Sequence, residues 1–67
     1  MKRSEVIRRV MRSCDCCDEE AKELLDKEME TLAELCHMGQ LREQDFELAC
    51  ATLGIGAECE SYFIECL

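Results

Sequence analysis

Seven of the 67 residues are cysteine, and no other feature restricts the possible folds of this chain as strongly. A short secreted chain with more than about 8–10 % cysteine is normally a disulfide scaffold. Here the number is odd, and the opening residues MKRSEVIRRV lack the apolar stretch of an export signal. We therefore expect a cytoplasmic protein whose thiols stay reduced, most of them packed in the core as small apolar side chains.

A chain of this length forms at most one domain, and it buries only about 60 % of the surface that its unfolded form exposes. It contains no proline or tryptophan, one tyrosine and two phenylalanines, so aliphatic residues, methionine and cysteine must fill the core. Small cores are often supplemented by oligomerisation, and we expect a homo-oligomer. We expect no membrane insertion, because no run approaches about 18 consecutive apolar residues.

Apolar residues recur at helical spacing in four segments of the sequence. The predicted helices span residues 4–13, 18–38, 43–53 and 57–66, joined by short connections that favour antiparallel neighbours. The sequence therefore predicts an all-α fold, a single domain over residues 1–67 built as a small bundle of three to four short amphipathic helices. The expected core residues are Ile7, Val10, Leu25, Leu32, Leu35, Leu41, Phe46, Leu53 and Phe63.

Polar residues and glycine mark the expected helix ends. Ser4 is a candidate N-cap for the first helix, and Asp15 or Asp18 for the second. Gly39 is the expected stop of the second helix. Residues 61–64 of the last segment would also suit a strand, but the apolar spacing of the segment favours a helix.

The charge of the chain is −8 and is unevenly distributed. Residues 1–13 carry five basic residues and one acid, whereas residues 14–35 carry nine acids and two lysines. This balance argues against direct binding of nucleic acid, which requires a basic surface. It favours a partner protein with a basic surface. One alternative is that the basic first helix lies beside the acidic second one and that the remaining acids form a solvated face.

The acids of the second helix define the candidate partner-binding residues. We expect the helix to present them as a strip that docks on a basic groove, which could be a nucleic-acid-binding surface of the partner. The strip would occupy positions that phosphates take on a nucleic acid, so the protein would act as a small regulator or inhibitor. The expected strip comprises Glu19, Glu23, Asp26, Glu30 and Glu34.

A thiol-based metal or redox module is the first alternative function. Cys14, Cys16 and Cys17 lie together at the start of the second helix, where the helix dipole lowers the pKa of a thiol and neighbouring acids raise it. Zinc would need ligands that converge at about 2.3 Å. Cys36 and His37 lie at the far end of a helix about 30 Å long, so they cannot complete such a site. We expect no cofactor, with zinc as the alternative.

Catalysis is not expected. His37 is the only histidine, and it directly follows Cys36 in a predicted helix. Neighbouring helical residues do not face each other, so these two side chains do not form a nucleophile–base pair. We therefore expect a binding protein and not an enzyme.

Residues 29–53, METLAELCHMGQLREQDFELACATL, resemble the short helical hairpin family called SHOCT. The family pattern is Leu-x-x-Leu, then a glycine, an aliphatic residue, Ser or Thr, and Glu-Phe. The resemblance implies a hairpin that mediates oligomerisation, which is the second alternative function. Leu32, Leu35, Gly39, Leu41, Asp45 and Phe46 occupy the family positions, and Arg42 replaces the Ser or Thr cap.

By size and charge, the whole chain is similar to small acidic phage proteins that antagonise host defence, including anti-CRISPR proteins. This resemblance implies an inhibitor that acts by protein–protein contact. It assigns no residues beyond the acidic strip.

Overall fold

The computed structural model describes residues 2–67 and shows four α-helices, one short 3₁₀ helix and no strand in that range. The predicted all-α fold is therefore confirmed, and the strand alternative for residues 61–64 is wrong. The elements are α1 (Arg3–Cys14), α2 (Asp18–His37), α3 (Glu43–Leu53), η1 (Ala57–Cys59) and α4 (Glu60–Cys66).

The first three helices end in the same way. In each, the chain turns through a residue with positive φ, namely Asp15, Gly39 and Gly54. The next backbone N–H then donates to the carbonyl five residues earlier, which is the long bond of a Schellman motif. These bonds run from Cys16 to Met11 (3.2 Å), from Gln40 to Leu35 (2.9 Å) and from Ile55 to Cys50 (2.9 Å).

The N-termini of α1 and α2 differ from the expectation. Their N-cap residues are Lys2 and Cys17, and neither makes a side-chain capping hydrogen bond. Ser4 lies inside the first turn of α1, and Asp18 is the first residue of α2. The acidic first turn of α2, which includes Asp18, provides negative charge where the helix dipole favours it, so a capping hydroxyl or carboxylate is not required.

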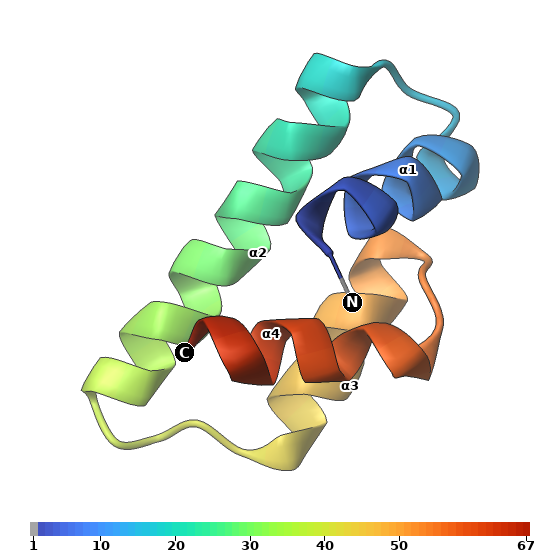
Figure 1. Ribbon diagram of the computed structural model, residues 1–67. Coiled ribbons are helices and arrows are strands. Elements are labelled where there is room, and N and C mark those ends of the chain that lie inside the picture. Colours follow the sequence, from blue (N-terminus) through green and yellow to red (C-terminus); the bar gives the residue numbers. More distant parts are fainter. Residues whose placement is uncertain (1) are drawn as a thin grey trace.

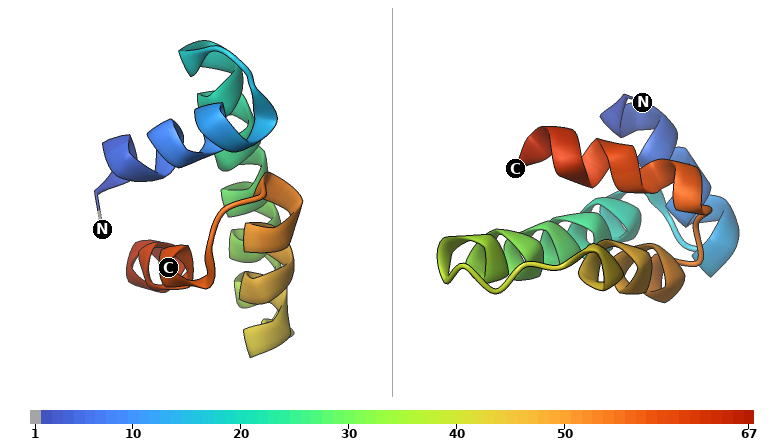
Figure 2. Two further views of the ribbon diagram at one scale, coloured as in Figure 1. Left: turned by 90° about the vertical axis from the view of Figure 1, so that its right-hand side faces the viewer. Right: turned by 90° about the horizontal axis from the view of Figure 1, so that it is seen from below.

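The helices form two layers. Figure 2 shows α2 and α3 side by side in one layer, with α1 and α4 crossing them in the other. The basic α1 packs against the acidic α2, and α4 follows the sharp turn after α3 (Figure 1). The long α2 therefore contacts α1 near its beginning and leads into the connection to α3 at its end.

The core lies between the two layers. Phe63, Leu25, Leu32, Leu53, Val6, Val10 and Cys59 are its largest fully buried side chains. Of the expected core residues, Ile7 is also buried, while Leu41 and Phe46 are half-buried and pack against the core. Ile55 and Tyr62 are buried as well, although neither was expected.

The core assignment of Leu35 is wrong. Its side chain is half-buried and does not belong to the core cluster. Leu35 lies in the last turns of α2 and lines an open hollow at the connection to α3. The helical period placed it correctly beside Leu32, but the bundle does not extend far enough to cover it.

The expectation that most cysteines pack in the core is also wrong. Cys50 and Cys59 are buried and Cys16 is half-buried, whereas the other four are exposed. The exposed thiols lie at or beside helix ends, where no second layer covers them. They are Cys14, Cys17, Cys36 and Cys66.

Candidate functional site

The five acids of the predicted strip are all exposed on α2. They recur every three or four residues from Glu19 to Glu34, a spacing that places them on one side of a helix. The buried residues Ala21, Leu25 and Leu32 lie on the opposite side. At about 1.5 Å per residue, the acidic strip is roughly 22 Å long. It is long enough to contact a helix or a groove of a partner at several points.

One member of the acidic strip is already paired within the chain. The Arg3 guanidinium of α1 donates to the Asp26 carboxylate at 2.8 Å, and both side chains are about half exposed. This bond raises the pKa of Arg3, and the Tyr62 hydroxyl contributes in the same direction. The basic first helix thus lies beside the acidic second one, and an ion pair joins them at Asp26.

The other four acids of the strip have no ion-pair partner within residues 2–67. Lys22 is the only lysine or arginine of α2 that forms an ion pair in this range, and it pairs with Asp18, one turn earlier, at 2.9 Å. Asp18 lies outside the strip. Glu19, Glu23, Glu30 and Glu34 therefore present their carboxylates to solvent.

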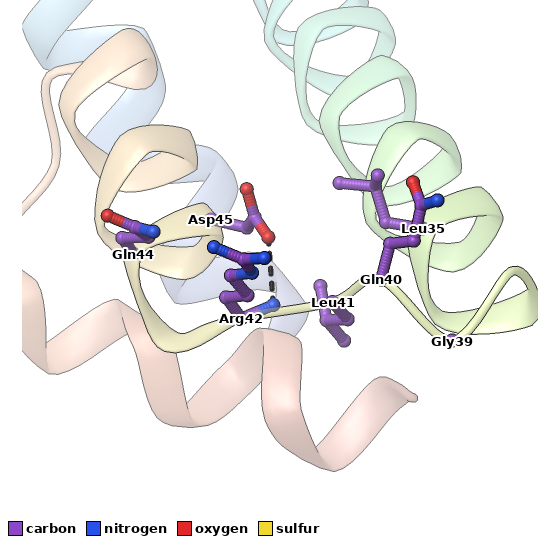
Figure 3. A pocket seen from close by; sticks show the side chains of 7 residues that line it. All are labelled: Leu35, Gly39, Gln40, Leu41, Arg42, Gln44 and Asp45. Carbon is purple, nitrogen blue, oxygen red and sulfur yellow. Dashed lines mark hydrogen bonds between the residues drawn. The ribbon is translucent and has the colours of Figure 1, made fainter.

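The connection between α2 and α3 borders a hollow of about 610 Å³ (Figure 3). In its lining, the Arg42 backbone N–H donates to the Asp45 carboxylate at 2.8 Å, at the start of α3. Asp45, at the third helical position of α3, thus satisfies the backbone N–H of the N-cap residue Arg42, which is one half of a capping box. Leu35 and Leu41 supply the apolar part of the wall. The hollow contains no second carboxylate, thiol or imidazole.

The three clustered thiols lie around the α1–α2 turn, but they have different environments. Cys14 is exposed and its Sγ lies 3.6 Å from the Leu53 carbonyl oxygen, to which it donates a weak hydrogen bond. Cys16 packs against the core, and burial followed by the negative charge of Glu20 raises its pKa. Cys17 is exposed at the N-cap of α2. The thiolate form of Cys16 is therefore disfavoured.

Cys14 and Cys17 have the C-x-x-C spacing that occurs in many zinc and redox sites. Within residues 2–67, however, no three or more histidine, cysteine, aspartate or glutamate side chains are grouped so that they could hold a metal ion. Cys36 and His37 are both exposed at the end of α2, one helix length away from this turn.

Comparison with protein-family models, with curated proteins and with solved structures found no match to this chain. None of the helices described between residues 2 and 67 has both the length and the apolar character needed to cross a membrane. A functional interpretation therefore depends on the surface of the molecule itself, where the acidic strip presents five exposed carboxylates along one helix.

Proposed function

We propose that this protein is a small binding protein that regulates or inhibits a partner by docking the acidic strip of α2 on a basic surface. The observation that carries the proposal is that four of the five strip carboxylates are exposed and have no ion-pair partner within residues 2–67. A partner surface that binds nucleic acid would supply matching cations, because it must neutralise regularly spaced phosphates.

The strength of such binding comes from several weak contacts. A solvent-exposed ion pair contributes at most about 1 kcal/mol, and salt screens it within about 8–10 Å. Four or five pairs along α2 would together give useful affinity and fast association that depends on ionic strength. Arg3 competes with the partner at Asp26 only, so the ends of the strip are the most available contacts.

The test reverses the charge of the strip. Glu23→Lys, Asp26→Lys and Glu30→Lys are combined, and binding of a synthetic arginine-rich helical peptide is measured by fluorescence anisotropy at two salt concentrations. Three lost pairs of about 0.5 kcal/mol each weaken binding roughly tenfold. The control, Glu5→Lys with Glu43→Lys and Glu65→Lys, changes the net charge equally but leaves the strip intact.

Circular dichroism must show unchanged helicity in both variants. The proposal requires that the strip variant loses binding while the control keeps most of it. If both variants lose binding equally, the affinity of the peptide depends only on the net charge of the protein, and the strip is a solvated face.

Oligomerisation through the α2–α3 hairpin is a second candidate. It is favoured by the large apolar side chains that the hairpin exposes, Met38 at 55 % and Leu48 at 66 %. Phe46 of α3 is only half-buried within one chain. If a Leu48→Gln variant still elutes as an oligomer in size-exclusion chromatography, the exposed face of α3 is not part of such an interface.

A further inference from the structure

A narrow groove separates α3 from the η1–α4 segment on the surface of the protein. Its volume is about 200 Å³, and it contains no residue of the acidic strip. Pockets that bind whole small molecules measure about 300–1,000 Å³, so this groove is better matched to a single side chain. It is lined by Glu47, Cys50, Ala51, Ile55, Ala57 and Glu60.

The floor of the groove is apolar. Cys50 and Ile55 are only 3 % and 8 % exposed, and Ala51 and Ala57 contribute methyl groups. Burial raises the pKa of the Cys50 thiol to about 11, and the negative charges of Cys59, Glu60 and Glu58 act in the same direction. The thiol is therefore uncharged at neutral pH and forms part of the apolar surface.

The rim of the groove is acidic on both sides. Glu47 comes from α3 and Glu60 from the first turn of α4. Neither carboxylate has a lysine or arginine within ion-pair distance in the described part of the chain. Nearby Glu58 does, because Arg9 of α1 pairs with it. A cation that enters the groove would thus meet two carboxylates that no other described side chain neutralises.

We propose that this groove binds an arginine side chain of a partner protein. Its methylene groups lie over Ala51 and Ile55, and its guanidinium lies between the carboxylates of Glu47 and Glu60. Long cationic side chains bury their stems on apolar surface while the charged head stays at the rim. The planar guanidinium offers five donors and is suited to carboxylates on two sides, whereas an ammonium is a point charge that holds its water more strongly.

This inference goes beyond the acidic strip, because it assigns a different surface and a specific side chain. The two surfaces can therefore be tested separately. A partner that uses both would place one arginine in the groove and several cations along α2.

The experiment is an NMR titration of the ¹⁵N-labelled chain with N-acetyl-arginine methylamide. Saturable shifts are expected at the backbone amides of Ala51, Ile55 and Ala57. The citrulline analogue has nearly the same shape but no charge, and the norleucine analogue has the stem alone. Both should bind at least fivefold more weakly than the arginine compound.

Two variants assign the binding to the groove. Glu47→Gln combined with Glu60→Gln should raise the dissociation constant at least fivefold, whereas Glu65→Gln, on another side of α4, should leave it unchanged. Ala51→Leu fills the groove without altering its charge and should also abolish the shifts. Equal binding of citrulline, or shifts that concentrate on the acidic strip, would overturn the assignment.

Discussion

Ser13, near the end of α1, packs directly against Gly54, the residue that ends α3. A Cβ atom added to Gly54 would lie 1.9 Å from the Ser13 Oγ and 3.2 Å from its Cβ. Gly54 also has a φ of +69°, a backbone angle that residues with a side chain rarely adopt. This close approach brings α1 against the turn from which η1 and α4 begin. One glycine therefore links the two layers of the fold.

Gly54→Ala is expected to destabilise the protein more than Gly39→Ala. Both glycines have positive φ, but a Cβ at Gly39 would meet nothing within 4 Å. Gly39→Ala should cost about 1 kcal/mol from backbone strain alone. Gly54→Ala should cost at least about 1 kcal/mol more because of the overlap with Ser13. Urea denaturation measures both values, and adding Ser13→Ala should recover part of the loss at Gly54.

Burial should decide the cost of removing apolar side chains. Phe63 is fully buried, so Phe63→Ala should lower the free energy of unfolding by about 3–5 kcal/mol, enough to unfold much of a chain this small. Leu48 is 66 % exposed, and Leu48→Ala should change the stability by less than about 0.5 kcal/mol. Thermal unfolding followed by circular dichroism compares the two. A large loss at Leu48 would indicate that its side chain is covered, as in an oligomer.

The helix pattern was readable from the sequence because the apolar period and the glycine stops agree. Leu25 and Leu32 follow the stripe of α2, and Gly39 and Gly54 mark the ends of two helices. The sequence did not predict how much of each apolar stripe is buried, because this depends on how far the neighbouring helices extend. Leu35 continues the stripe of α2 but lies beyond the covered part.

The acidic strip could be found from the sequence alone, since its residues lie on one helix at a regular spacing. The groove could not. Glu47 and Glu60 are 13 residues apart and belong to different helices, so only the sharp turn after α3 brings them to one groove. No local pattern marks either residue as different from a solvated glutamate.

The buried thiol of Cys50 should make the stability depend on alkaline pH. Its pKa is raised in the folded protein to about 11 from an ordinary value near 9, so the folded state prefers the protonated thiol. This contribution is complete below pH 9 and is lost as the pH rises toward 11. Between pH 8.5 and 10.5, the wild type should lose more free energy of unfolding than Cys50→Ala. A variant with the same pH dependence as the wild type would contradict this.

Six of the seven thiols should react in two groups under native, reducing-agent-free conditions, while the half-buried Cys16 belongs to neither. Cys14, Cys17, Cys36 and Cys66 are exposed and should be alkylated first by iodoacetamide, whereas Cys50 and Cys59 are buried and should react only on unfolding. Samples are taken at successive times and digested, and mass spectrometry of the peptides gives the order in which the cysteines are alkylated. Protection of Cys14 and Cys17 together would instead indicate a disulfide or a bound metal, and native mass spectrometry would distinguish these by the added mass.

The contact between Arg3 and Asp26 should contribute little to stability but should affect binding. Both side chains are about half exposed, so a double-mutant cycle with Arg3→Ala and Asp26→Ala should give a coupling energy below about 1 kcal/mol in low salt and less in high salt. Arg3→Ala should also free the Asp26 carboxylate for a basic partner. The arginine-rich peptide should therefore bind this variant more tightly than the wild type, whereas Arg8→Ala removes the same charge without freeing a strip carboxylate. Equal effects of the two substitutions in the anisotropy assay would show that Arg3 acts only through the net charge of the protein.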